Sequence, residues 1–241
     1  MRIAIDTHTH SVASGHAYST IDQLAEGARL RGLEGFVLTD HGPALPGGPH
    51  KYHFFNLRVL PDYIAGVRVY RGIEANILDS CGTLDFDEQL ATRLDFVMAG
   101  FHEICMSPQN LIVHTEALLM AMENPYLVAI SHPGNPVYPI DQVAVVRRAA
   151  ELGKALEIND SSFRIRKGSS ETCLALAKLG TKFGCPVVCG SDAHYWGDVG
   201  RFDTALSVIT KAGIDQKQLV NADKQRFDAF ILHHSTLRIG I

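Results

Sequence analysis

The chain has 241 residues, of which 46% are hydrophobic and 20% are charged, and this length is compatible with one large domain or two small ones of roughly 150 residues or less. Lys and Arg number 22 against 26 Asp and Glu, so the formal net charge is −4, and the lack of a basic block argues against nucleic-acid binding. No apolar run approaches the roughly 20 residues of a membrane span, and Asp6 interrupts the N-terminus before a signal peptide could form. We therefore expect a soluble, cytoplasmic globular protein with no membrane partner.

Short apolar, β-branched runs alternate along the chain with segments of helical periodicity. We expect strands at residues 2–6, 35–39, 67–73, 95–100, 127–131, 155–158 and 186–190. We expect helices near residues 20–31, 110–122, 140–152, 170–183, 200–212 and 223–234. This alternation predicts right-handed βαβ units around a parallel sheet, which is either a closed barrel or an open doubly wound sheet. The chain has no GxGxxG after its first strand and no GxxxxGK[ST], so the common nucleotide-binding forms of the open sheet lose support.

Residues 42–61 depart from this rhythm, because they are rich in Gly, Pro and aromatic residues and too long for an ordinary connection. Loops of that length inside a compact domain are often functional. No repeat, low-complexity tract or linker-like stretch divides the chain, so we expect one domain over residues 1–241. The five cysteines form no CxxC pair, which favours buried, reduced thiols over a disulfide or metal role.

Metal-binding side chains occur where the expected strands end. The nine candidates are His8, His10, His16, His41, Glu74, His102, His132, Asp192 and His194. Most are spaced by about one βα unit of roughly 30 residues. Consecutive strands would therefore place them together at the carboxyl end of a barrel, where the active sites of such folds lie. A single histidine after a strand is usually structural, but the shared phase of this set favours metal binding. Nine ligands exceed the needs of one ion, so the pattern predicts two or three ions bridged by a carboxylate.

Other polar residues near the strand ends have two readings each. Asp6 and Asp40 stand where carboxylates orient metal-binding imidazoles, although they could equally be turn residues. Cations that could bind an anionic substrate, or merely be solvated surface charges, are Lys51, Arg164, Arg166, Lys167 and Arg201. Among the remaining histidines, His50 and His53 could line the pocket through the long 42–61 segment, while we interpret His114, His233 and His234 as surface or packing residues.

Six motifs resemble, in order, those of the PHP superfamily, named for polymerase and histidinol phosphatase. They are Asp6-Thr7-His8-Thr9-His10, Thr39-Asp40-His41-Gly42, Gly72-Ile73-Glu74, Phe101-His102-Glu103, Ser131-His132-Pro133 and Gly190-Ser191-Asp192-Ala193-His194. The match spans residues 6–194, and the position of His16 most resembles the YcdX-type phosphatases.

This resemblance implies an α/β fold, a distorted seven-stranded (β/α)7 TIM-like barrel, that hydrolyses phosphate monoesters of small molecules. It implies a site of three metal ions, usually zinc, with Mn²⁺ or Fe²⁺ as alternatives. The implied ligand sets are His8, His10, Glu74 and Asp192 for one ion, Glu74, His102 and His132 for a second, and His16, His41 and His194 for a third. The nucleophile would be a metal-bridging hydroxide held through Glu74 and Asp192, so that no protein nucleophile is required.

Two other functions stay open at this point. A metal-dependent amidohydrolase or lactonase also begins with HxH on a barrel strand, but such sites usually end with a lone Asp and often hold a carboxylated Lys. This chain instead has Asp192 with His194, and no lysine in phase at a strand end. The other alternative is a noncatalytic metal-binding module. The substrate, the metal and the formation of a homo-oligomer are not decided by the sequence.

Overall fold

The computed structural model describes residues 1–239, and side chains as far as residue 235. Its strands are β1 (Ile5–Thr9), β2 (Gly35–Leu38), β3 (Tyr63–Ile64), β4 (Val67–Asn76), β5 (Phe96–Gly100), β6 (Ala129–Ile130), β7 (Ala155–Asn159) and β8 (Val187–Gly190). Its α-helices are α1 (Ile21–Leu30), α2 (Lys51–Asn56), α3 (Glu88–Ala91), α4 (Leu111–Met122), α5 (Gln142–Glu151), α6 (Ser162–Ile165), α7 (Ser169–Phe183), α8 (Asp203–Ala212) and α9 (Lys224–Ile239). Three 3-10 helices are η1 (Val12–Ser14), η2 (Leu57–Val59) and η3 (Trp196–Asp198).

The strands form a nearly closed parallel barrel. They are hydrogen-bonded in the order β1-β2-β4-β5-β6-β7-β8, every neighbouring pair is parallel, and the short β3 pairs antiparallel with β4. Thr9, the last residue of β1, and Ala193, beyond the end of β8, form a parallel bridge that joins the two ends of the sheet. The expected seven-stranded TIM-like barrel is therefore confirmed, and the open sheet is excluded.

Asn221 fills the remaining seam between β1 and β8. Its side-chain amide donates to the carbonyl oxygens of Ile5 and Cys189, both at 2.8 Å, and its oxygen accepts from the Cys189 amide at 3.1 Å. Backbone groups at a barrel seam would otherwise be buried without partners. One fully buried side chain thus replaces the missing ladder.

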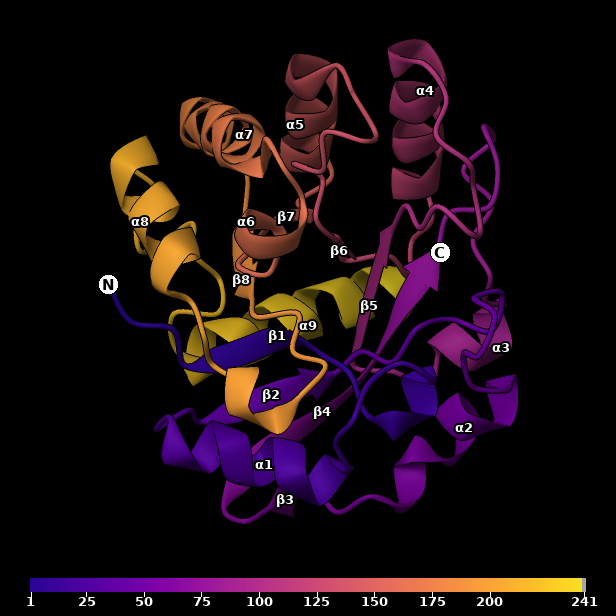
Figure 1. Cartoon of the computed structure of the whole chain (residues 1–241), viewed down its shortest axis with the longest axis vertical. Helices are drawn as coiled ribbons and strands as arrows, with labels where there is room; N and C mark the ends of the chain where they lie inside the picture. Colours follow the sequence, from indigo (N-terminus) through magenta and orange to yellow (C-terminus); the bar gives the residue numbers. More distant parts are fainter. Residues whose placement is uncertain (240–241) are drawn as a thin grey trace.

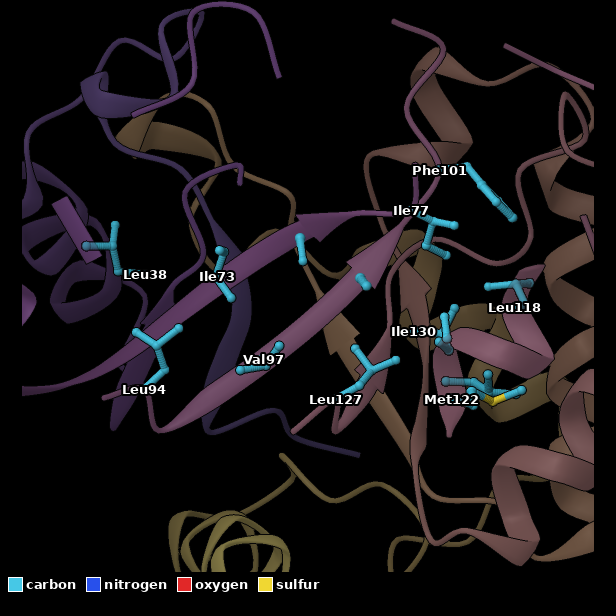
Figure 2. Packing of buried hydrophobic residues seen from close by; sticks show 14 of the residues in the cluster. Leu38, Ile73, Ile77, Leu94, Val97, Phe101, Leu118, Met122, Leu127 and Ile130 are labelled. Atoms are coloured by element: carbon cyan, nitrogen blue, oxygen red, sulfur yellow. The ribbon is translucent and has the colours of Figure 1, made fainter. Parts of the chain in front are cut away.

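Apolar side chains fill both the barrel and the layer outside it. Inside, Phe227 of α9 packs against Tyr70 and Phe96 with ring centroids 5.1 and 5.7 Å apart, and Figure 1 shows α9 in yellow lying across the strands. Outside, Leu118 and Met122 of α4 lie in one buried cluster with residues of the strands, as Figure 2 shows. The two layers leave the carboxyl ends of the strands free for polar side chains.

Local sequence signals start and stop the helices. Thr20 and Gln23 form a reciprocal capping box at the start of α1, and Asn110 accepts from the Val113 amide at the start of α4. Gly213 ends α8 at a φ of 73°, a conformation that favours glycine. These signals place the six expected helices within a few residues of their observed bounds, apart from the longer end of α9.

Four elements were not expected from the sequence, namely α2, α3, α6 and β3. Residues 42–61 are not a long loop, because they contain α2 and η2 and bury Phe54 and Leu57. The first expected strand also ends too early, since β1 continues to Thr9 and contains His8. Short elements of this kind are stabilised by tertiary burial, and their residue patterns are too short to be predicted from the local sequence.

The five cysteines are free thiols in the structure. Cys173, Cys185 and Cys189 are buried as expected, whereas Cys105 is half-buried and Cys81 is exposed. Burial raises the pKa of the Cys185 thiol to about 12, so this thiol stays protonated at neutral pH. Within residues 1–239, no helix has both the length and the apolar character needed to cross a bilayer.

Candidate metal centre

Glu74 of β4 lies at the centre of a ring of histidines at the carboxyl ends of the strands. Its Oε1 is 2.7 Å from His132 Nε2 and 3.4 Å from His102 Nε2. Three ring nitrogens lie 3.0, 3.2 and 3.6 Å from Oε2, those of His41, His8 and His10. Burial would raise the pKa of Glu74, but the charges of the surrounding imidazoles lower it well below its usual range. This carboxylate is therefore ionised and can bridge two cations.

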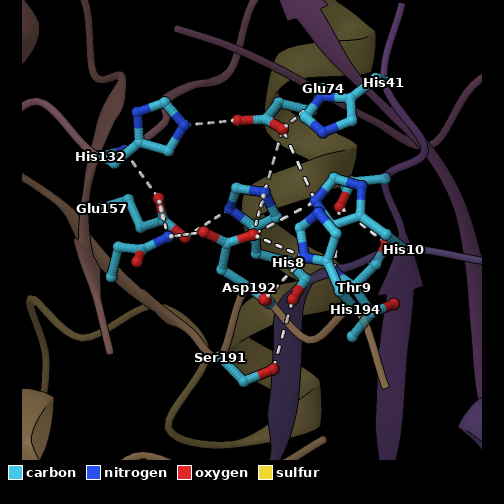
Figure 3. A network of polar contacts seen from close by, with 12 residues as sticks. His8, Thr9, His10, His41, Glu74, His132, Glu157, Ser191, Asp192 and His194 are labelled. Atoms are coloured by element: carbon cyan, nitrogen blue, oxygen red, sulfur yellow. Dashed lines mark hydrogen bonds and ion pairs between the residues drawn. The ribbon is translucent and has the colours of Figure 1, made fainter. Parts of the chain in front are cut away.

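Asp192 is the second carboxylate of the cluster. Its Oδ1 is 3.3 Å from His10 Nε2 and 3.5 Å from His194 Nδ1. His194 in turn places its Nε2 atom 3.1 Å from the Nε2 atom of His16. The nine expected residues are therefore brought together from strands β1, β2, β4, β5, β6 and β8 and the segments that follow them (Figure 3).

Two residues of the cluster have a strained backbone. His132 has a φ of 33° and Asp192 a φ of 55°, in the left-handed region that side chains other than glycine rarely adopt. Such strain costs of order 1–3 kcal/mol and is concentrated at functional sites. Here it lies two residues after the ends of β6 and β8, where His132 contacts Glu74 at 2.7 Å and Asp192 contacts His10 Nε2 at 3.3 Å.

The buried polar atoms at the centre lack the partners that a folded protein normally provides. Atoms without a hydrogen-bond partner are Nε2 of His8 and His10, Nδ1 of His41, both ring nitrogens of His102 and Oε2 of Glu74. Unsatisfied buried atoms are rare in native proteins, and a group of imidazole nitrogens around a carboxylate oxygen is the donor set that binds a metal ion. Within the described residues, three groups of ligand atoms lie within 4.8 Å of one another: His8, His10 and Glu74; His41, Glu74 and His102; and His10, His41 and His194. Imidazole nitrogen with carboxylate oxygen suits Zn²⁺, Mn²⁺ or Fe²⁺.

Glu157 is a member of this site that the sequence reasoning missed. This carboxylate on β7 is 1% exposed, lies 2.8 Å from His8 Nδ1 and accepts from the His132 amide at 2.7 Å. With Nδ1 of His8 donating to Glu157, the free Nε2 of that ring faces Glu74, the arrangement in which carboxylates orient metal-binding imidazoles. A charged residue inside the apolar run Ala155-Leu156-Glu157-Ile158 was the available signal, because a buried charge needs a partner.

Gly190 is required by this arrangement. A Cβ atom at this position would collide with the Glu157 carboxylate and with Cβ of His8. Glycine at the end of β8 therefore lets β1 and β7 bring these two side chains together.

Asp6 and Asp40 hold backbone and hydroxyl groups rather than the imidazoles beside them in sequence. Asp6 accepts from the amides of His8, Ser191 and Gly200, and burial raises its pKa to about 6. Its expected role in orienting the His8 ring is taken by Glu157 instead.

Asp40 reaches the cluster through a serine. It accepts from the hydroxyl of Ser14 at 2.7 Å, and Ser14 Oγ lies 3.3 Å from His10 Nδ1. Burial would raise the pKa of Asp40, but hydrogen bonds with His53 and Ser14 lower it below its usual value. His53 therefore acts on this carboxylate, 3.0 Å away, and is not among the residues that line the cavity above the cluster.

The cluster lies at the floor of a cavity of about 470 Å³, which we call the first cavity. Arg164 and Arg166 line it, and Arg166 Nη1 is 3.6 Å from Asp192 Oδ2. Lys51, Lys167 and Arg201 are not among its lining residues, and Arg201 pairs with Asp198 at 3.2 Å. Of the five expected cations, the tertiary structure thus brings two to the site.

The histidines outside the pattern have structural contacts. His50 caps α2 by accepting from the Tyr52 amide at 3.3 Å and does not line the first cavity. His114 is buried and accepts from the Gln109 amide at 2.7 Å. His234 is also buried, whereas His233 is exposed, in agreement with the packing and surface roles expected for them.

No family model matches the chain. A protein of Acetivibrio thermocellus described as "Probable phosphatase" is 48% identical over 231 residues, which cover 96% of this chain and 96% of that protein. A protein of Syntrophotalea carbinolica with the same description is 48% identical over 92% of each chain. The chain belongs to this family of probable phosphatases. Membership in this family confirms the class of enzyme that the sequence predicts.

Solved structures show how widely the fold of these probable phosphatases is shared. A crystal structure of histidinol phosphate phosphatase from Lactococcus lactis, complexed with zinc, L-histidinol and phosphate, has a TM-score of 0.60 at 18% identity and covers 88% of this chain and 94% of its own. A probable 2-pyrone-4,6-dicarboxylic acid hydrolase from Acinetobacter baumannii has a TM-score of 0.56 at 13% identity, with 96% and 99% covered. Both neighbours share the fold of this chain, and the second shows that the fold alone does not separate phosphatases from other hydrolases.

Proposed function

We propose that this member of the family hydrolyses phosphate monoesters of small molecules at a centre of three metal ions, as the YcdX-type phosphatases do. The observation that carries the proposal is the set of buried, unpaired ring nitrogens around Glu74. His8, His10, Glu74 and Asp192 would hold one ion, Glu74, His102 and His132 a second, and His16, His41 and His194 a third. The geometric groups overlap with these sets, but His41 stands in place of His132 in the second and His10 in place of His16 in the third. Zinc is the ion we expect, with Mn²⁺ or Fe²⁺ as alternatives.

The charge of the site favours a phosphate dianion. With three divalent ions bound, +6 would face −3 from Glu74, Asp192 and Glu157, which leaves about +3 near the floor of the cavity. Arg164 and Arg166 add positive charge at its wall. Guanidinium groups bind phosphate oxygens in a paired geometry, so we assign these two residues to substrate phosphate and not Lys51 or Arg201.

Divalent ions in such a site supply an acidified water and neutralise charge on a phosphoryl group. The chain itself positions the ligands. Glu157 fixes the orientation of the His8 ring, and Ser14 and Asp40 restrain His10.

The amidohydrolase alternative gains no support from the lysine closest to a strand. Lys154 precedes β7, at the amino end of the strand, and its Nζ donates to the carbonyl oxygens of Asn124 and Leu127, both at 2.6 Å. A carboxylated lysine would have to lie at the carboxyl end, beside Glu74. A cytoplasmic location stays a prediction, and the oligomeric state stays open.

The first experiment counts metals and measures turnover in the same preparation. The protein is purified without chelator, its metal content is determined by elemental analysis, and p-nitrophenyl phosphate is assayed beside an amide and a lactone. His10→Ala and Asp192→Ala remove proposed ligands, and His233→Ala is the matched control outside the cluster.

Two to three metals per chain, with phosphate release that is lost in both ligand variants and kept in the control, would support the proposal. Cleavage of the amide or lactone without phosphate release would favour the amidohydrolase alternative. A metal-loaded protein that is inert toward all three substrates would favour a noncatalytic metal-binding module.

A further inference from the structure

A second cavity of about 400 Å³ borders the first one. The two share His16, His102 and Arg166 as lining residues. A volume of this size is within the range of cavities that bind small molecules. Any phosphate ester held at the metal cluster therefore has a neighbouring space into which its alcohol part can extend.

The second cavity has an apolar and aromatic part beside its polar residues. Leu45, Pro46, Phe101, Ile104 and Tyr138 line it together with Asn135 and the charged and shared residues. The side chain of Ile104 is 67% exposed although it is large and hydrophobic. An apolar group of a ligand placed here would remove this surface from water, which is favourable.

The charges of the second cavity differ from those of the first. Apart from the shared histidines, its charged lining residues are Glu103 and Arg166. Arg166 lines both cavities, lies 3.6 Å from Asp192 and donates to Ser162 Oγ at 2.8 Å, so this cation already has an acidic partner at the metal cluster. The one charged residue that lines the second cavity and not the first is the carboxylate of Glu103, which would repel an additional anionic group.

We propose that the second cavity binds the alcohol part of the substrate and selects organic alcohols with an apolar body and no second anionic group. This inference rests on the proposed function. It excludes bisphosphates, polyphosphates and phosphorylated carboxylic acids as good substrates, because each would place a negative charge beside Glu103.

The test compares benzyl phosphate with 4-carboxybenzyl phosphate, which differ by one remote negative charge. We expect kcat/KM to favour benzyl phosphate by about tenfold in the wild type, and Glu103→Lys to abolish or reverse this preference. Glu116→Lys, at an exposed position on α4, is the matched control and should keep the wild-type ratio. Calorimetric titration with benzylphosphonate and 4-carboxybenzylphosphonate measures the same preference without turnover.

The apolar wall is tested by a second pair of variants. Ile104→Ala should lower the preference for benzyl phosphate over methyl phosphate about three- to tenfold, whereas Ile112→Ala, an equally exposed isoleucine on α4, should not change it. Phosphate release with ratios that are the same in the wild type, Glu103→Lys and Ile104→Ala would overturn the inference and leave the proposed function intact. A wild-type protein that cleaves none of the esters and binds neither phosphonate would overturn both.

Discussion

At the scale of single residues, the site depends on carboxylates that are buried and paired. Glu157 joins β1, β6 and β7, because it bonds the His8 ring, the His132 amide and the side chain of Asn159. A buried carboxylate is stable only with such partners. Its position 149 residues from His8 and 25 residues from the His132 amide explains why no local pattern predicted its role.

Replacing Glu157 tests whether this carboxylate supports metal binding. We expect Glu157→Gln to weaken metal affinity about 10- to 100-fold, because the amide neither attracts the His8 Nδ1 proton as strongly nor keeps the ring in its tautomer. Metal retained after dialysis against a graded chelator series measures the loss. Glu116→Gln serves as the control, and equal retention in the wild type and Glu157→Gln would contradict this prediction.

The pKa of Asp6 predicts a pH dependence of stability. Burial raises this pKa from 3.8 to about 6, so the folded protein holds the proton more tightly than the unfolded chain does. The linked stability is present in full below about pH 4 and is lost as the pH rises through about 6. The metal-free wild type should therefore lose stability relative to Asp6→Asn mainly between about pH 4 and 6.

Urea midpoints of the two metal-free proteins at a series of pH values measure this difference. Asp22→Asn, at an exposed carboxylate of α1, should track the wild type through the same range. A constant difference between the wild type and Asp6→Asn would show that the pKa of Asp6 is not raised.

At the scale of elements, strand ends and short helices bring functional side chains to one side of the barrel. Asp160 follows β7 and accepts from the amides of Thr204 and Ala205 at 3.0 and 2.9 Å, where α8 begins without a side-chain cap of its own. Its other oxygen accepts from Arg164 Nη1 at 2.9 Å. One residue thus caps a helix and orients a cation of the first cavity.

Substitution of Asp160 should separate these two effects. Asp160→Ala is expected to lower the free energy of unfolding by about 1–2 kcal/mol through the lost cap and to raise KM for a phosphate ester a few-fold through the released Arg164. Asp160→Asn keeps an oxygen for the helix amides and should lose less stability. The control Asp141→Ala, which removes the cap of α5, should lower stability without changing KM. An unchanged KM in Asp160→Ala would show that Asp160 does not contribute to substrate binding.

At the scale of the whole molecule, closure of the barrel determines whether the cluster exists. His8 lies in the first strand, His10 comes directly after it, and Asp192 follows the last strand. Their contacts across the seam require β1 and β8 to be adjacent. Asn221 and the Thr9–Ala193 bridge hold the two strands together at different heights of the barrel.

Asn221→Ala should open the seam. Loss of three buried hydrogen bonds leaves the Ile5 carbonyl and the Cys189 amide without these partners, while the Cys189 carbonyl keeps the Thr7 hydroxyl at 3.2 Å. We therefore expect a loss of about 2–4 kcal/mol in the free energy of unfolding. Amide exchange should accelerate in β1 and β8 more than in β4 and β5. The control Asn110→Ala, which removes the cap of α4, should lower the free energy of unfolding by about 1 kcal/mol. A uniform change of amide exchange over all strands in Asn221→Ala would argue against a role of Asn221 at the seam.

The sequence by itself determined the nine residues of the cluster, the alternation of strands and helices and most helix bounds, because strand ends, caps and βα spacing are local signals. It did not determine α2 or α6, which depend on burial and contacts made far along the chain. Only the tertiary structure brought Glu157 to His8, separated Arg164 and Arg166 from Lys51 and Arg201, and placed Asn221 in the seam. These features join residues distant in sequence, and the geometry of barrel closure alone makes them neighbours.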